Sequence, residues 1–247
     1  MNILLKFYTP FDRANEQVKA IEHLEKAFGI AIDHEIQSDG ELLPNSKLIP
    51  LKEKYFSSTK QEVIEDVELY TVDQSLHKKL LLSRYLLEKG FQYADTKLWY
   101  ILIELDISYV DEKFFSLFND LALNLNAYWA KAIPKEAEAD INMQHMSDLP
   151  EILNKYNLPQ LGSPKDFKSP THPANLGWIN FWNAEYIKLT GINSTQNRVN
   201  FNKYVDNSDG SFSFMITEKP LNLEKTDHLD TVRELYEKYP IIGNRMK

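Results

Sequence analysis

The chain has 247 residues, with 36 Asp and Glu against 28 Lys and Arg, a formal net charge of −8, 8 glycines and no cysteine. The lack of cysteine excludes disulfides, thiolate metal sites and cysteine nucleophiles. The acidic balance argues against a protein that follows nucleic-acid phosphates with clustered Lys and Arg.

The N-terminal sequence lacks the long apolar run and small-residue cleavage site of a secretory signal. No stretch approaches the roughly 18 consecutive apolar residues of a membrane-spanning helix. Walker and G-x-G-x-x-G patterns are also missing from the sequence. We therefore expect a cytoplasmic protein that has no membrane partner, no nucleic-acid partner and no cofactor.

The N-terminal part predicts four elements: a strand over 3–8, a helix over 11–28, a strand over 67–72 and a helix over 75–89 that ends at Gly90. The segment 67–72 has two interpretations, because Val63, Val67 and Tyr70 also fit one face of a helix. We favour the strand, since Val, Tyr and Thr are β-prone. Residues 30–60 are predicted to be irregular.

The middle of the chain predicts a buried strand over 97–107, an amphipathic helix over 111–124 and a strand over 127–133. Residues 134–173 then hold six of the 11 prolines together with the acidic run Glu136, Glu138 and Asp140. This composition is typical of a linker or a long surface connection.

The last third begins with a short apolar strand within 176–182, followed by a helix to Thr190 that Asn183 caps and Gly191 closes. Segments 198–205 and 211–217 alternate around an Asp/Gly loop and predict a β-hairpin. A final helix is predicted over 226–239.

These elements predict an α+β fold with mixed or antiparallel sheets and single packing helices. One arrangement that fits this class is a pair of similar halves, each with a sheet and its helices. We expect one domain over 1–247, or two subdomains, 1–133 and 174–247, joined by the proline-rich connection 134–173.

Few residues suggest catalysis. Glu104 and Asp106 share one face of a predicted strand, as carboxylates do in metal-dependent nucleases and glycosidases. We favour a simpler explanation, in which they lie on the solvent-facing side of a half-covered sheet or at a strand end, and the six histidines show no zinc-binding spacing. We therefore assign no catalytic, metal-binding or cofactor-binding residue and expect a protein that is not an enzyme.

Charge is unevenly distributed along the chain. Between Gln61 and Ser75 there are five acidic residues and no Lys or Arg, and the five are Glu62, Glu65, Asp66, Glu68 and Asp73. Such a run is either a solvated face or an acidic docking surface for a basic partner. We take these five residues as candidate partner-binding residues.

Two tryptophans are the other candidates. In a strand over 177–182, Trp178, Asn180 and Trp182 lie on one face. A strand buried between two layers explains this pattern, and so does a pair of interface anchors, because Trp is enriched at binding hot spots. Trp178 and Trp182 are therefore candidate partner-binding residues as well.

Residues 176–185, with the Gly-Trp-Ile-Asn segment, resemble bacterial immunity proteins of polymorphic toxin systems. Residues 216–221, His228 and the ending 239–243 resemble the C-terminal part of the same proteins. The nearest named group is the immunity protein 52 family or a related family with the Gly-Trp segment, and the likeness covers about residues 95–245.

This resemblance implies a function by binding, in which the chain neutralises a cognate toxin, for example a nuclease effector of type VI secretion. The partner is expected to be a basic toxin domain. Two alternatives remain open: an enzyme that uses Glu104, Asp106 and a histidine from the C-terminal half, and a structural or adaptor subunit.

Overall fold

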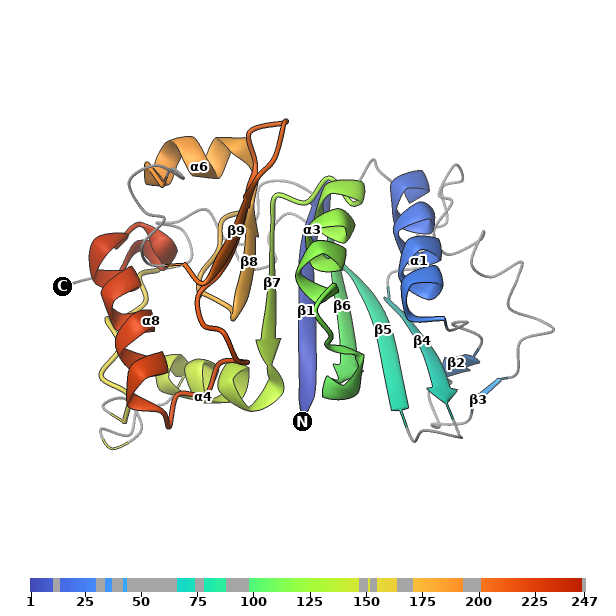
Figure 1. Ribbon diagram of the computed structural model, residues 1–247, viewed down its shortest axis with the longest axis horizontal. Helices are drawn as coiled ribbons and strands as arrows, with labels where there is room; N and C mark the ends of the chain where they lie inside the picture. The colour runs from blue at the N-terminus through green and yellow to red at the C-terminus, as the bar shows by residue number, and fades with distance from the viewer. Residues whose placement is uncertain are drawn as a thin grey trace. The chain divides into compact units, whose positions relative to one another are not determined.

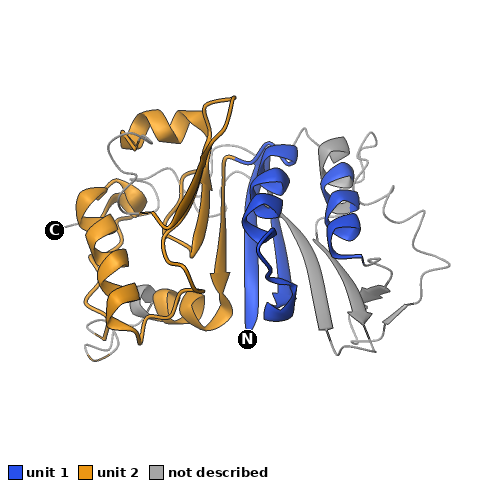
Figure 2. Cartoon of the chain, in the orientation of Figure 1, with its two compact units in different colours: residues 1–88, 96–127 blue, residues 89–95, 128–247 orange. Residues whose placement is uncertain are grey.

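The computed structural model describes residues 1–10, 14–29, 34–36, 42–43, 66–73, 78–87, 98–146, 151, 155–163, 171–192 and 201–245. The chain divides into two compact units (Figure 2). Unit 1 contains residues 1–88 and 96–127, and unit 2 contains residues 89–95 and 128–247.

Unit 1 is built on an antiparallel sheet. Its strands, in spatial order, are β3 (Leu42–Leu43), β2 (His34–Ile36), β4 (Asp66–Asp73), β5 (Lys78–Leu87), β6 (Leu98–Asp106) and β1 (Asn2–Pro10). Every neighbouring pair in this order is antiparallel. The predicted strands over 3–8, 67–72 and 97–107 are thus confirmed.

Helices α1 (Ala14–Phe28) and α3 (Phe114–Asn124) pack against each other on one face of this sheet (Figure 1). A single turn of 3-10 helix, η2 (Ile107–Tyr109), follows β6. Alternate residues of β1 face the helices, and Phe7 meets Phe118 of α3 with 5.7 Å between ring centroids. The period-two pattern of β1 therefore places its apolar side in the core of unit 1.

The helix predicted over 75–89 is wrong, because residues 78–87 form strand β5. Leu and Lys favour helices in isolation, and this segment is rich in both. In the fold, β5 forms an antiparallel ladder with β4 on one side and with β6 on the other. Pairing on both sides satisfies the backbone groups that point to either neighbour, so tertiary pairing outweighs the local helix propensity.

The strands of unit 2, in spatial order, are β7 (Trp129–Pro134), β8 (Ile179–Trp182), β10 (Phe212–Met215) and β9 (Lys203–Asp206), and each neighbouring pair is antiparallel. Its helices are α4 (Lys135–Met146), α6 (Ala184–Thr190), α8 (Thr226–Lys238) and the short 3-10 helix η4 (Ile242–Asn244). The α+β class predicted from the sequence is confirmed by the antiparallel strands and the helices of both units.

In unit 2, the sequence signals for the helix cap, the helix end and the β-hairpin predict the observed structure correctly. Asn183 caps α6, because its Oδ1 accepts a hydrogen bond from the backbone N–H of Tyr186 at 2.9 Å, and Gly191 ends the helix with a φ of 68°. The predicted hairpin is formed by β9 and β10, with Gly210 at a φ of 85° in its loop. Part of the expected connection 134–173 is helical, since residues 135–146 form α4 with Ile141 fully buried.

Aromatic rings fill the core of unit 2. Trp182 meets Phe214 with 4.8 Å between ring centroids and meets Tyr186 at 5.0 Å, in both cases edge to face. Phe201 lies 4.5 Å from Phe214. Edge-to-face pairs add to the stabilisation that comes from burial of the ring area.

Replacing Phe214→Ala should therefore lower the free energy of unfolding by about 3–5 kcal/mol, because the ring is fully buried and leaves a cavity. Urea unfolding followed by tryptophan fluorescence measures the loss. The control is Leu189→Ala on α6, where the side chain is 52% exposed and the change should stay within about 0.5 kcal/mol. Equal effects of the two variants would contradict the assignment of Phe214 to the core.

Candidate functional site

The Gly-Trp segment runs against strand β7 so closely that only glycine fits at its start. A Cβ placed on Gly177 would lie 2.7 Å from Cβ of Lys131 and 2.8 Å from the carbonyl oxygen of Ala132. Real Cβ atoms do not approach neighbours this closely, and both neighbours belong to a strand that cannot move freely. The glycine is thus required by close backbone packing.

The next residues of the segment close a turn into β8. Asn180 Oδ1 accepts a hydrogen bond from the Gly177 N–H at 2.8 Å, and Asn180 Nδ2 donates to the Gly177 carbonyl at 3.0 Å. The indole N–H of Trp178 donates to the carbonyl of Thr217 at 2.8 Å. Each polar group of the segment named here is satisfied within unit 2, so the Gly-Trp-Ile-Asn pattern has a structural role.

The two candidate tryptophans lie in the interior of unit 2. Trp178 is 3% exposed and Trp182 is 1% exposed. A binding anchor has to reach the surface of its partner. These rings instead pack within their own unit, which agrees with the other interpretation of the sequence, a strand buried between two layers.

Replacing Gly177→Ala should cost about 1–3 kcal/mol of unfolding free energy, because the added methyl group must displace backbone or Cβ atoms of β7. Chemical denaturation measures this loss, with Ser116→Ala at an exposed position of α3 as the control. An unfolding midpoint equal to that of the wild type would contradict the close approach of β7 to the backbone at Gly177.

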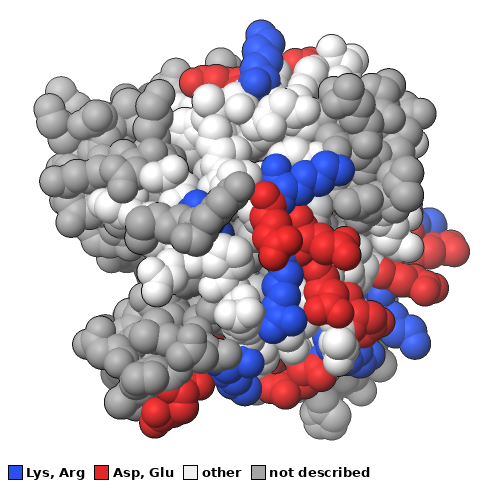
Figure 3. Space-filling model, turned by 90° about the vertical axis from the view of Figure 1, so that its left-hand side faces the viewer, with Lys and Arg blue, Asp and Glu red and all other residues white. Residues whose placement is uncertain are grey.

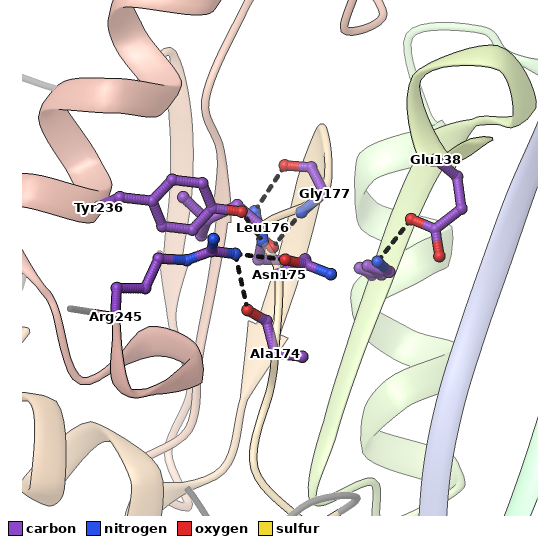
Figure 4. A network of polar contacts seen from close by, with 9 residues as sticks. Glu138, Ala174, Asn175, Leu176, Gly177, Tyr236 and Arg245 are labelled. Atoms are coloured by element: carbon purple, nitrogen blue, oxygen red, sulfur yellow. Dashed lines mark hydrogen bonds and ion pairs between the residues drawn. The ribbon is translucent and has the colours of Figure 1, made fainter. Parts of the chain in front are cut away.

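Arg245 ties the C-terminus to the segment that leads into β8 (Figure 4). Its guanidinium donates to the carbonyl of Pro159 at 2.6 Å, to the carbonyl of Ala174 at 3.1 Å and to Oδ1 of Asn175. The guanidinium carbon lies 3.8 Å from the ring centroid of Tyr236 on α8. A guanidinium suits such a junction, because its planar group can stack on an aromatic ring while its N–H groups donate to several carbonyl oxygens.

Tyr236 completes the same junction from α8, because its hydroxyl accepts a hydrogen bond from the Leu176 N–H at 3.0 Å. Burial raises the pKa of Tyr236 and lowers the pKa of Arg245. Figure 4 also shows the buried ion pair between Glu138 and Lys131, whose Nζ lies 2.6 Å from the carboxylate. These groups hold α8, α4 and β7 around the segment 174–180.

A cavity of about 610 Å³ opens beside α8, and we call it the α8 cavity. Its floor consists of five buried residues: Phe201, Ile216, Thr217, His228 and Leu235. Its rim carries exposed charges of both signs: Glu218, Lys219, Lys225, Asp227 and Glu234. The surface of this cavity is mostly polar, because its apolar lining residues are buried and barely reach it.

His228 is the buried titratable residue among those that line the α8 cavity, and it is 7% exposed. Its Nδ1 accepts a hydrogen bond from the backbone N–H of Asn222 at 3.1 Å, which assigns the proton of the neutral ring to Nε2. Among the described residues, Nε2 has no hydrogen-bond partner. Burial lowers the pKa of His228 below 6.5, so the ring is neutral at pH 7.

The pKa of His228 should therefore be lower in the folded chain than in the chain unfolded in urea, as measured by NMR titration of the imidazole. Since the unfolded state binds the proton more readily, the contribution of His228 to stability is complete above pH 6.5 and is lost as the pH falls toward the folded pKa. A pKa of His228 in the folded chain at or above its value in the unfolded chain would contradict the burial of this side chain.

The outward side of α8 carries four acidic residues beside the exposed Lys238. Asp227, Asp230, Glu234 and Glu237 are exposed and follow a spacing of three, four and three residues, which places them on one side of the helix. His228, Val232, Leu235 and Tyr236 form the buried side. We call the four carboxylates the acidic face of α8, and Figure 3 shows acidic and basic side chains interspersed on the side of the molecule that bears this helix.

The five acidic candidates of the segment 61–75 are only partly placed by the structure. Glu62 and Glu65 lie outside the described residues. Asp66 and Asp73 are the two ends of β4, and Glu68 lies between them, opposite Ser83 of β5 in the strand register. Only the backbone of these three residues is described.

The two carboxylates considered for catalysis have structural partners in unit 1. Glu104 accepts a hydrogen bond from Nδ2 of Asn2 at 2.6 Å, and Asp106 caps η2 by accepting from the Ser108 N–H at 2.8 Å. Neither lines the α8 cavity, where His228 lies. Within the described part of the chain, no group of three or more His, Asp or Glu is arranged to hold a metal ion.

Each helix in the described ranges is too short or too polar to cross a bilayer.

The α8 cavity and the acidic face beside it are not among the features predicted from the sequence. The face has a signal in the sequence, namely four acids at helical spacing within the final predicted helix. The cavity has none, because its floor combines residues that are far apart in the sequence.

Antiparallel strands with packed helices and a charged-rimmed cavity beside α8 define an α+β protein with a candidate binding site. The chain belongs to the family described as "Domain of unknown function (DUF5953)", which matches residues 13–247. A comparison with curated proteins found no match.

Among solved structures, the chain is similar to one titled "Pseudomonas aeruginosa T6SS protein PA0821". The TM-score is 0.61 at 13% sequence identity, and the alignment covers 97% of this chain and 72% of the other chain. At this identity the likeness concerns the fold.

Proposed function

We propose that this protein is an immunity protein that binds a cognate bacterial toxin and neutralises it by protein–protein contact. The observation that carries the proposal is the acidic face of α8, in which Asp227, Asp230, Glu234 and Glu237 lie exposed on one side of a helix whose other side is buried. The partner is a basic toxin domain.

The arrangement of charge favours a macromolecular partner. Asp230 is partly neutralised by Arg233 at 3.2 Å, and the Arg233 side chain is itself held by the carbonyl of Tyr156. Glu234 and Glu237 carry no ion pair among the described residues. Together with a net charge of −8, these exposed carboxylates attract a basic surface and steer its approach.

A toxin that acts on nucleic acid fits this chemistry, because a groove for phosphates is lined with Lys and Arg. An acidic helix face is complementary to such a groove. The structural neighbour carries "T6SS protein" in its title, and this supports a link between the present fold and type VI secretion. The resemblance of the Gly-Trp segment to immunity proteins supports the same function.

The direct test is co-expression with the toxin domain encoded by the neighbouring gene. We expect the chain to restore growth of cells that express this toxin, and we expect the two proteins to co-purify. Failure of both rescue and co-purification would overturn the proposed function.

The contribution of the acidic face is tested by reversing its charge in Glu234→Lys/Glu237→Lys. The association rate with the toxin should fall about tenfold or more at low salt, and the difference should shrink at high salt because ions screen exposed charges. The matched control is Glu22→Lys/Asp120→Lys, which changes the net charge equally at exposed positions of α1 and α3. Equal losses for the two variants would assign the effect to net charge alone.

A further inference from the structure

A histidine joins α8 to the turn that leads into it. In this turn the Lys225 N–H donates to the carbonyl of Asn222 at 3.1 Å, and Asn222 Oδ1 accepts a hydrogen bond from the Glu224 N–H at 2.9 Å. The Asn222 N–H donates to Nδ1 of His228 at 3.1 Å. We call residues 222–225 the entry turn, and His228 connects it to the first turn of α8.

His228 takes the place of a conventional helix cap. Lys225 is the N-cap residue of α8, and its side chain makes no capping hydrogen bond. His228 is the third residue of the helix, and its ring reaches back to a backbone N–H that precedes the helix, as the third residue does in a capping box. The usual residue at this position is Glu or Gln, whereas an imidazole loses its acceptor when it takes up a proton.

The hydrogen bond and the proton compete for the same nitrogen atom. A backbone N–H only donates, so Nδ1 of His228 must be unprotonated to accept from Asn222. An imidazolium carries a hydrogen on both ring nitrogens, and it would turn a donor toward the Asn222 N–H. The contact therefore exists with the neutral ring alone.

Burial and the helix keep the His228 ring neutral at pH 7. The side chain is 7% exposed, and the first turn of a helix is electrostatically unfavourable for a cation. Burial is the largest cause of the lowered pKa of His228, Lys225 acts in the same direction, and Asp227 acts in the opposite direction.

The charges around His228 are mixed in sign. Apart from His228, the charged or titratable residues that line the α8 cavity are Lys225, Asp227 and Glu234 on the side of α8 and Glu218 and Lys219 on the facing segment. The remaining lining residues carry no charge. In the entry turn, Glu224 is paired with Lys155 at 2.8 Å. No single counter-charge therefore fixes the protonation of the ring.

We propose that His228 acts as a pH-sensitive latch, in which protonation of the ring breaks the hydrogen bond from Asn222 and releases the first turn of α8 from the entry turn. Leu221 and Leu223 are 1% and 2% exposed, so they keep the preceding segment in the core while the latch opens. The change is local, and it reaches Asp227, which belongs to the acidic face and lines the α8 cavity.

Amide hydrogen exchange of the full chain, followed by NMR, tests the latch. The pH is lowered from 7.5 to one unit below the midpoint of the His228 ring titration, and each rate is corrected for the intrinsic pH dependence of exchange. We expect the protection of the Asn222 amide to fall about tenfold, the effect of one lost hydrogen bond. The Leu229 amide, which donates to the Lys225 carbonyl at 2.9 Å, should lose protection with it.

The amide of Phe214, on a strand with partners on both sides, should keep its protection over the same range. The proposal would be overturned by protection of Asn222 that stays constant while the ring titrates. A joint loss at Asn222 and Phe214 would overturn it as well, since that pattern is global unfolding.

The tautomer of the wild-type ring is an independent check that needs no variant. The nitrogen chemical shifts of His228 should place the hydrogen on Nε2 at pH 7.5, because Nδ1 accepts from Asn222. A hydrogen on Nδ1 at this pH would contradict the contact and with it the latch.

His228→Gln separates titration of the ring from titration of the carboxylates nearby. The amide oxygen accepts from the Asn222 N–H at every pH, so Asn222 should stay protected where the wild type loses protection. His23→Gln, at a half-buried histidine of α1, is the matched control and should lose protection as the wild type does. A pH dependence that persists in His228→Gln would assign the effect to the carboxylates and overturn the role of His228.

The effect on the toxin rests on the proposed function. When the ring is protonated, the dissociation constant of the wild type should rise about threefold more than that of His228→Gln, which is the effect of one exposed charge pair. Equal rises would overturn the link between the latch and binding.

The latch and the proposed function fail in different ways. If the toxin co-purifies while the Asn222 amide shows no pH dependence, the latch fails and the proposed function stands. If the latch opens as expected but the toxin neither co-purifies nor is neutralised, the proposed function fails and the latch stands.

Discussion

The close approach of Gly177 to strand β7 is the constraint on which the architecture of unit 2 depends. With no Cβ at this position, the backbone of the segment packs directly on Lys131 and Ala132. Asn180 then closes the turn through two hydrogen bonds to Gly177. The direction of β8, and therefore of the strands that pair with it, follows from this contact.

The same segment determines where α8 lies. Leu176 donates to the Tyr236 hydroxyl, and Arg245 stacks on the Tyr236 ring while it donates to the carbonyl of Ala174. A buried guanidinium is costly to desolvate, and here several protein oxygens and an aromatic ring compensate that cost. With one side of α8 held in this way, its four outward carboxylates face solvent, where the proposed partner would meet them.

Several features were predictable because their causes are local. Asn183 and Gly191 delimit α6 through a side-chain cap and a left-handed backbone, and both signals are visible in the sequence. The apolar alternation of β1 likewise indicates a strand with one buried face. Residues 78–87 were misread as a helix, because their Leu and Lys content favours a helix and only pairing with β4 and β6 makes them a strand.

The sequence by itself determined the α+β class, the acidic charge and the acids spaced along the last helix, because these depend on composition and on local periodicity. Only the tertiary structure decided that Trp178 and Trp182 lie in the core and that His228 presents a hydrogen-bond donor to a cavity. Burial depends on which segments meet, and the floor of the α8 cavity joins residues from 201 to 235 that no local pattern connects.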